Sequence, residues 1–426
     1  MRTAYAILTY LMLPLYALYW VLRGLGNRTY WDRLGQRYGF GFPQLREGAV
    51  WVHAVSVGEV QAAAPLVRAL QQRFPERDVL VTTMTPTGAE RVRILFGDSV
   101  YHCYLPFETT YAVQNFFDAV KPALALVMET EIWPNLYHAC GKRGIPLVLV
   151  SARISPKSVK RYRRLLPMFR EALSHGILIA AQGETDAKRF LSLGAVPERT
   201  WIMGNIKFDF ELPKELPANG AAFRDEVLGR PRPVWIAAST HDKEEELVLD
   251  AHREVLAEIP DALLVLVPRH PERFGTVAQL LKKRKFSFVS RTGGAGCNPE
   301  TEVYLGDTMG ELPVFYAASD VAFVGGTLVP IGGHNLLEPG ALGLPVITGP
   351  HLFNTQDIAD LFTDSGASII VKDSSALATG VIDLLRDSAA RESIGRKGRQ
   401  IVDANRGALK RLLVLLSPQL ERVGER

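Results

Sequence analysis

Short apolar runs alternate with stretches of helical periodicity from residue 49 onward. The pattern predicts helices at 59–74 and 86–96 and strands at 49–53, 78–83, 123–128, 147–150 and 177–181. Strands that are apolar throughout, and that helices separate, are typical of a parallel sheet buried on both faces. This part of the chain is therefore predicted to form a doubly wound α/β domain.

The pattern restarts after residues 211–233, which are rich in proline, glycine and charge and are predicted to be a linker or an irregular crossing. Further strands are predicted at 234–238, 262–267, 286–289, 321–324 and 345–348. Two doubly wound domains on one chain would leave a cleft between them, and ligands of such sheets bind at the carboxyl ends of strands. We expect an N-terminal segment at 1–24, domains at 25–212 and 213–405, and a helical end at 406–426 that packs back across the lobes.

The N-terminal segment is apolar and uncharged from Thr3 to Leu22, between Arg2 and Arg23. About 20 helical residues span roughly 30 Å, the thickness of a bilayer core. The arginines that follow favour a retained helix with the body on the cytoplasmic side. A helix lying in the membrane interface, which Pro14 and the tyrosines make plausible, and a cleaved signal peptide are the alternatives.

Composition narrows the class of protein. The 426 residues are 47% hydrophobic and 22% charged, which is typical of a globular chain of two or three domains. A net charge of +4 is too small to argue for a nucleic-acid partner. The three cysteines are far apart and odd in number, so we expect free thiols and neither a zinc site nor a disulfide framework.

Two acidic motifs follow strands of the first domain. Glu59 lies in a segment reading HAVSVGE, where the positive end of a helix would favour an ionised carboxylate able to accept a proton. The same spacing, Ser56 to Glu59, is also a capping-box pattern with a purely structural role. Glu129 and Glu131 lie in METEIWPN and are candidates for acid–base or acceptor-binding work, or for a helix cap and a solvated side chain.

Residues 153–170 form a basic stretch with interleaved apolar residues and no acid. A soluble helix face would mix both signs of charge, so this composition favours contact with an anionic lipid surface over a merely solvated face. Its basic residues are Arg153, Lys157, Lys160, Arg161, Arg163, Arg164 and Arg170.

Glycine and basic motifs follow the strands of the second domain, in the segments VPRHPER, GDTMGEL, FVGG and GGHNLLE. Glycines let the backbone approach a phosphate, and a following helix offers amides to it. Arg269 would supply positive charge to a phosphate, and Glu338, near Asn335 on one helix face, would accept bonds from ribose hydroxyls. No GxGxxG follows the first strand and no Asp-x-Asp pair suits a divalent ion, so neither a dinucleotide site nor a metal is expected.

These segments together, with TTMTPTG and SAR, resemble the 3-deoxy-D-manno-octulosonic acid (Kdo) transferases of lipid A assembly along nearly the whole chain. The resemblance implies a GT-B-like fold with the acceptor in the first lobe and the donor in the second. It implies an inverting transfer of Kdo from CMP-Kdo to a tetra-acylated lipid A precursor (lipid IVA) at the inner membrane, without a metal or cofactor.

The family's functional residues can be carried over where the motifs match. Glu59 is similar to the general base, and Glu129 and Lys207 to residues that stabilise the transition state. The resemblance assigns CMP binding to Pro268, Arg269, Met309, Gly310, Glu311, Asn335, Leu336, Leu337 and Glu338. Two rival functions remain: a sugar-nucleotide epimerase of the same two-lobed fold, and a membrane adaptor without activity.

Overall fold

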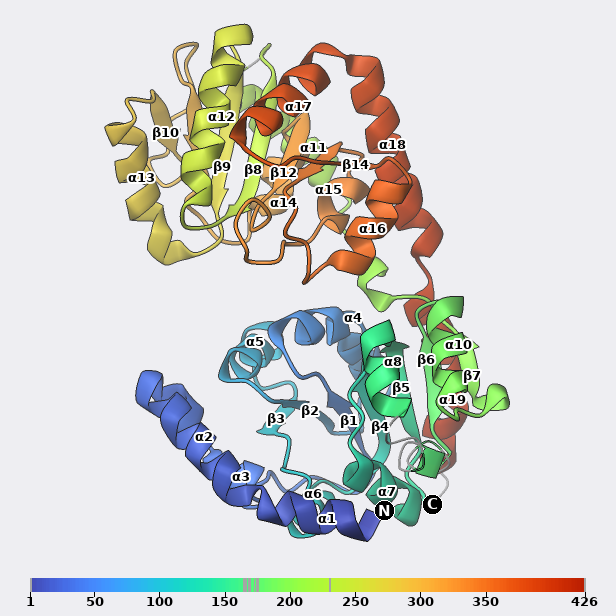
Figure 1. The fold of residues 1–426 in the computed structure, drawn as a ribbon. Coiled ribbons are helices and arrows are strands. Elements are labelled where there is room, and N and C mark those ends of the chain that lie inside the picture. Colours follow the sequence, from blue (N-terminus) through green and yellow to red (C-terminus); the bar gives the residue numbers. More distant parts are fainter. Residues whose placement is uncertain are drawn as a thin grey trace. The chain divides into compact units, whose positions relative to one another are not determined.

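The computed structural model describes residues 2–424 except 164–166, 168–169, 172, 174–175 and 230. The chain divides into two units (Figure 1). Unit 1 holds Met1–Phe210 and Arg406–Arg426, and unit 2 holds Glu211–Asn405. The C-terminal helix therefore belongs to unit 1, which consists of two separate segments of the chain.

Unit 1 is built on a parallel sheet of seven strands in the order β3-β2-β1-β4-β5-β6-β7. Side chains of each strand alternate between two cores, one covered by α6, α7 and α10 and the other by α4, α5 and α19. The strands are β1 (Ala49–His53), β2 (Val79–Thr83), β3 (Tyr101–Tyr104), β4 (Pro122–Met128), β5 (Leu147–Ala152), β6 (Leu178–Ala181) and β7 (Thr200–Ile202). The helices are α1 (Arg2–Leu11), α2 (Leu13–Gly26), α3 (Leu34–Arg37), α4 (Val57–Arg73), α5 (Pro86–Phe96), α6 (Thr110–Val120), α7 (Pro134–Arg143), α8 (Pro156–Arg163), α10 (Glu184–Ser192) and α19 (Ala408–Gly424).

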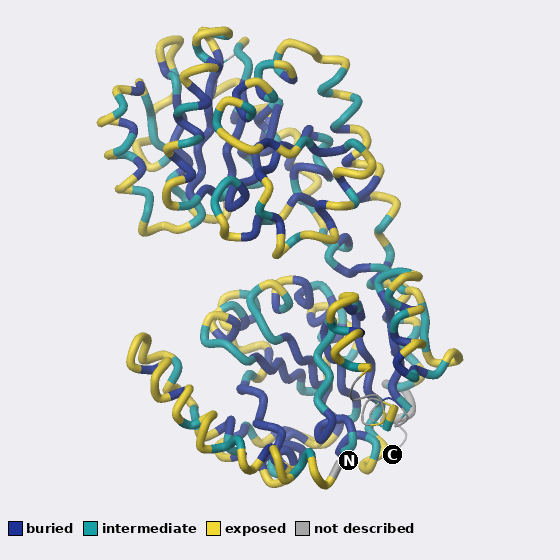
Figure 2. The backbone as a smooth tube through the Cα atoms, viewed as in Figure 1, coloured by how far each residue is buried: buried dark blue, intermediate teal, exposed yellow. Residues whose placement is uncertain are grey.

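Unit 2 repeats this plan with a parallel sheet ordered β10-β11-β9-β8-β12-β13-β14. Figure 2 shows the buried strands of each unit inside an exposed outer layer. The strands are β8 (Val234–Thr240), β9 (Leu263–Pro268), β10 (Phe288–Ser290), β11 (Val303–Leu305), β12 (Val321–Val324), β13 (Val346–Thr348) and β14 (Ser368–Ile370). The helices are α11 (Leu216–Phe223), α12 (Glu244–Glu258), α13 (Phe274–Lys283), α14 (Leu312–Ala317), α15 (Leu337–Ala341), α16 (Gln356–Asp364), α17 (Ser374–Arg386) and α18 (Ser388–Asn405).

The predicted linker at 211–233 is wrong. It contains α11, followed by a π-helical turn at Arg224–Leu228, and both belong to unit 2. Gly220 on α11 lets this helix lie directly against α14, because a Cβ atom there would come within 2.4 Å of the Ala317 side chain. Glycine marks a close packing contact here, not a flexible segment.

The predicted continuous helix over 3–22 is also wrong, since α1 and α2 meet at a 41° bend. Pro14 lies in the first turn of α2, where its missing N–H costs nothing, and the same residue would have interrupted a longer helix. Among the described residues no single helix is long and apolar enough to cross a membrane, while the bent pair together has the required length and hydropathy.

Aromatic side chains hold α1 and α2 against the rest of unit 1. The Tyr5 hydroxyl donates to Glu108 Oε2 at 2.9 Å, and the Tyr16 ring stacks on Phe107 with centroids 4.9 Å apart. Trp20 is buried, and the guanidinium carbon of Arg37 lies 3.7 Å from the centroid of its ring. The other side of the pair carries exposed apolar side chains, namely Ile7, Leu8, Leu11, Leu15, Leu18, Val21, Leu22 and Leu25.

Candidate functional site

The candidate catalytic residues of unit 1 follow its two central strands. β1 and β4 are parallel neighbours, and the order of the sheet reverses between them. Glu59 lies in the first turn of α4, after β1, and Glu129 comes directly after β4. Their strands therefore end at the switch point of the sheet, where ligands of doubly wound folds bind.

Glu59 is half-buried and does not form the predicted capping box. Ser56, the N-cap residue, makes no side-chain cap bond, and Glu59 Oε2 accepts a hydrogen bond from the Val55 backbone N–H at 2.9 Å. Burial, together with the nearby carboxylates of Glu129 and Glu131, raises the pKa of Glu59 to about 8 despite this bond. This direction is opposite to the prediction of a carboxylate kept ionised by the helix end, because desolvation outweighs the bond from Val55.

Glu129 is held by two cations. Its Oε1 is 2.8 Å from Lys207 Nζ and its Oε2 is 2.8 Å from Arg153 Nε. Burial acts to raise the pKa of Glu129, but these two partners more than offset it, so the pKa lies below its ordinary value. Its backbone has φ of 54°, a strained conformation for a residue other than glycine, which is typical of functional sites.

Arg153 was predicted to belong to the lipid-facing basic stretch, and its bond to Glu129 contradicts this. Lys157, Lys160, Arg161 and Arg163 do lie exposed on α8, as a basic stretch at the surface requires. Arg164 and the apolar residues Leu165, Leu166, Met168 and Phe169 lie outside the described residues.

Lys207 reaches Glu129 from a short 3₁₀ turn at Ile206–Phe208. Asn205 Oδ1 accepts from the Lys207 backbone N–H at 3.0 Å, and Ser151 Oγ accepts from that of Ile206 at 3.1 Å. The turn is thus fixed to the end of β5 as well as to its own cap. A rigid turn of this kind holds the ammonium group in place beside the carboxylate.

The candidate donor residues of unit 2 also follow strands. Pro268 ends β9, and the next residue, Arg269, donates its backbone N–H to Thr240 O at 2.9 Å. The guanidinium of Arg269 makes no ion pair with any described residue. It is therefore a cation available to a bound anion, and its role at a phosphate stays a prediction.

The segment Met309–Glu311 has a second cation beside it. Met309 is 61% exposed, and Gly310 has φ of 88°, which favours glycine. Arg291 Nη2 is 2.7 Å from Glu311 Oε1, and its hydrogen bonds hold the pKa of Glu311 below its ordinary value.

The segment Asn335–Glu338 begins α15. Asn335 donates through Nδ2 to Glu338 Oε1 at 3.0 Å and accepts at Oδ1 from the Leu337 backbone N–H at 3.0 Å. Burial raises the pKa of Glu338, and its bond from Asn335 opposes the rise. Leu336 and Leu337 have buried side chains, so only their backbone is left to face a ligand.

The glycine-rich loop after β12 does not offer the amides that the sequence predicted. Glu244, fully buried at the start of α12, accepts from the backbone N–H groups of Gly326, Thr327 and Leu328 at 2.6, 3.0 and 2.9 Å. Gly332 and Gly333 donate their amides to Gly326 O. These five backbone amides are therefore not available to a bound phosphate.

Three histidines near Arg269 were missed. His241 follows β8, His270 follows β9, and His334 lies between β12 and α15. The available signal was their position after predicted strands, in the segments STHDKEE, VPRHPER and GGHNLLE. Among the described residues, no group of three or more histidine, cysteine or acidic side chains is arranged to hold a metal ion.

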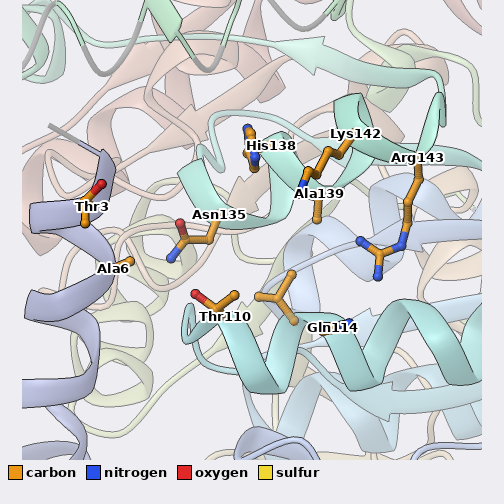
Figure 3. Close-up of a pocket in the computed structure, with 10 residues that line it drawn as sticks. Thr3, Ala6, Thr110, Gln114, Asn135, His138, Ala139, Lys142 and Arg143 are labelled. Atoms are coloured by element: carbon orange, nitrogen blue, oxygen red, sulfur yellow. The ribbon is translucent and has the colours of Figure 1, made fainter.

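A separate groove of 480 Å³ in unit 1 lies among α1, α6 and α7 (Figure 3). Its basic side chains are His138, Lys142 and Arg143. Arg143 is already engaged by Asp118, with Nη2 3.2 Å from Oδ1.

Comparison with known proteins decides the family. Residues 32–210 match the family model for 3-deoxy-D-manno-octulosonic acid transferase (kdotransferase), and residues 230–401 match that for glycosyl transferases group 1. The chain is 45% identical to the 3-deoxy-D-manno-octulosonic acid transferase of Haemophilus influenzae over 426 residues, 99% of each protein. It is 38% identical to that of Bordetella pertussis over 90% of each.

The chain belongs to the Kdo transferase family. It is accordingly a glycosyltransferase. Solved structures support the fold: the UDP-GlcNAc 2-epimerase of Neisseria meningitidis is 15% identical with a TM-score of 0.55, covering 87% of this chain and 100% of its own. A glycosyltransferase of Rickettsia africae is 13% identical with a TM-score of 0.54, covering 88% and 99%. The GT-B-like prediction of two parallel sheets is confirmed, and the cleft between them stays a prediction.

Proposed function

We propose that this Kdo transferase moves Kdo from CMP-Kdo to the tetra-acylated lipid A precursor of lipopolysaccharide, with inversion at the anomeric carbon and without a bound metal. The observation that carries the proposal is in unit 1. A half-buried carboxylate with a pKa of about 8, Glu59, lies at the same sheet edge as a fixed carboxylate, Glu129, that two cations hold ionised. Paired carboxylates with opposite pKa shifts are typical of acid–base sites.

Glu59 is the proposed general base. A base works best when its pKa is close to the working pH, and Glu59 meets this condition. It takes the proton of a glucosamine hydroxyl of the lipid as that oxygen attacks the anomeric carbon. The electron pair of the bond to phosphate passes to CMP.

Charge stabilisation is the proposed work of the remaining residues. Glu129, fixed by Lys207 and Arg153, places a permanent negative charge where positive charge develops on the sugar, and Lys207 keeps it ionised. Arg269 of unit 2 meets the phosphate of the donor. The resemblance assigns CMP contacts to Pro268, to Met309–Glu311 and to Asn335–Glu338, with Glu338 facing ribose hydroxyls.

We also propose that the protein works on the cytoplasmic side of the inner membrane. The bend between α1 and α2 and the aromatic contacts on one side of the pair favour a helix pair lying in the interface rather than a single span. The exposed apolar side chains of α1 and α2 would enter the lipid, and the exposed cations of α8 would contact anionic headgroups.

A donor and acceptor panel tests the function. The full-length protein is incubated with CMP-Kdo or with a UDP-sugar, with and without lipid precursor, in the presence and absence of EDTA. We expect CMP and glycosylated lipid only when CMP-Kdo and lipid are both present, equally with EDTA, and an inverted anomeric centre by NMR. Epimerised sugar nucleotide without lipid would support the epimerase alternative instead, and a loss of activity in EDTA would contradict metal independence.

A further inference from the structure

His241 and His334 form a direct pair in unit 2. Their Nε2 atoms are 2.7 Å apart, although the residues are 93 positions apart in the sequence. The ring planes differ by 5° and the centroids are 5.0 Å apart, so the rings meet edge to edge, nearly in one plane. This is the geometry of an N–H···N hydrogen bond between two imidazoles.

The pair therefore consists of two different tautomers when it is neutral. One Nε2 carries the shared proton and the other accepts it, and a neutral imidazole has one N–H. Hence one ring has a protonated Nδ1, which donates, and the other has a bare Nδ1, which accepts. A single added proton would turn both Nδ1 atoms into donors and give the pair a positive charge.

The surroundings keep the pair neutral while no anion is bound. Burial, together with the nearby His270 and Arg269, lowers the pKa of His241 to about 4 and that of His334 to about 3. The positive charge of Arg273 also contributes to the lowered pKa of His241.

The neighbouring acids are engaged elsewhere. Asp242 and Glu245 pair with Arg273 at 2.9 and 3.0 Å, Glu272 lies 3.9 Å from His270, and Glu244 is held by backbone amides. Arg269 makes no ion pair with a described residue, so its charge stays available to an anion bound beside the pair.

We propose that His241 and His334 act as one unit that binds the phosphate of the sugar nucleotide by taking up a proton. This proposal rests on the proposed function, since the phosphate that the pair would bind is that of the donor CMP-Kdo. The loop amides that would otherwise meet a phosphate are already bonded to Glu244 and Gly326 O. Beside Arg269, the protonated pair would supply two side-chain donors.

Such a pair also suits the departure of CMP. The donor phosphate is a diester with one negative charge, and it becomes a monoester with close to two when its bond to the sugar breaks. A positive pair that gives up no proton in this step would balance the new charge. His241 and His334 are in this sense binding residues for the leaving phosphate.

Calorimetry of nucleotide binding to the full chain tests the proposal. The probe is the methyl ester of CMP, whose diester, like that of the donor, keeps one negative charge over the pH range used; cytidine is the phosphate-free control. Titrations at pH 7 in buffers of different ionisation enthalpy give the number of protons taken up. The variants are H241Q, H334Q, the double variant, and H270Q as a matched imidazole outside the pair.

We expect wild type and H270Q to take up close to one proton with the methyl ester and none with cytidine. Their affinity should fall up to about tenfold per pH unit as pH rises above 6, because the bound state holds more protons. H241Q and H334Q should lose the uptake and flatten this dependence, and the double variant should be no worse than either alone because the two act together.

Equal proton uptake in wild type and H241Q, or none in wild type, would overturn the pair's role while leaving the proposed function standing. Additive losses in the double variant would show that the two histidines do not act as one unit. Failure of the wild-type protein to bind either CMP or its methyl ester would contradict the proposed function itself. Melting temperatures of all variants establish that they are folded.

Discussion

The rate of Kdo transfer should rise with pH because of Glu59. Its pKa of about 8 means that about a tenth of the molecules carry the ionised base at pH 7 and about nine-tenths at pH 9. The kcat/KM for the lipid acceptor, at saturating donor, should therefore rise about tenfold over this range. A carboxylate with an ordinary pKa near 4.5 would give a flat profile instead.

The assay is the initial rate of CMP release at constant ionic strength, with lipid dispersed in detergent so that membrane binding does not contribute. Saturating donor removes the opposite pH dependence expected from the histidine pair. E131Q should move the rising limb to lower pH, because one of the negative charges that raise the pKa of Glu59 is lost. E59Q should be flat and about 10²- to 10⁴-fold slower. A flat wild-type profile from pH 7 to 9, with the protein folded throughout, would refute the role of burial at this residue.

Three substitutions test other parts of the structure. E129Q should lower activity at least about tenfold and the free energy of unfolding by about 2 kcal/mol, since it removes the largely buried carboxylate that both Lys207 and Arg153 bind. In urea denaturation, E90Q at a surface pair should change stability by less than about 0.5 kcal/mol, and equal effects would contradict the account. L8E, at an exposed apolar position, should weaken sedimentation with anionic vesicles and leave transfer to detergent-dispersed lipid unchanged; unchanged sedimentation would contradict the interfacial helix. G395A should destabilise unit 2 by about 1–3 kcal/mol because the new Cβ would lie 1.9 Å from a backbone oxygen, whereas G275A meets nothing within 4 Å and should be tolerated; similar melting temperatures would refute the packing argument.

The long buried strands were predictable because a short, continuous apolar run between two helices fits few structures other than a buried strand. The strands that the pattern missed are β3, β7, β11 and β14, which have only three or four residues each. Most lie at or near a sheet edge, where partial exposure weakens the apolar signal. The helix α11 was missed because the segment around it, residues 211–233, is rich in proline, glycine and charge, although Pro217 lies in the first turn of the helix and Gly220 serves its packing.

The sequence could predict the candidate site only as far as the ends of the strands determine which residues lie at one edge of the sheet. Parallel strands place the residues after β1 and β4 at one edge, so Glu59 and Glu129 were found from position and resemblance. The pairing of Glu129 with Lys207 joins residues 78 positions apart and follows from the tertiary fold. The sign of the Glu59 pKa shift depends on the balance between burial and the bond from Val55, which a linear sequence does not contain. The histidine pair likewise exists only once two loops meet.

Mass spectrometry of the lipid product tests the central claim most directly. Lipid A precursor is incubated with CMP-Kdo and either the wild-type protein or E59Q, each checked for folding by its melting temperature. The account predicts that wild type adds the mass of one or more Kdo residues to the lipid, which also counts the additions, and that E59Q adds none in the same time. Unchanged lipid with folded wild-type protein would contradict the proposed reaction, and equal mass gain with E59Q would contradict the assignment of Glu59 as its base.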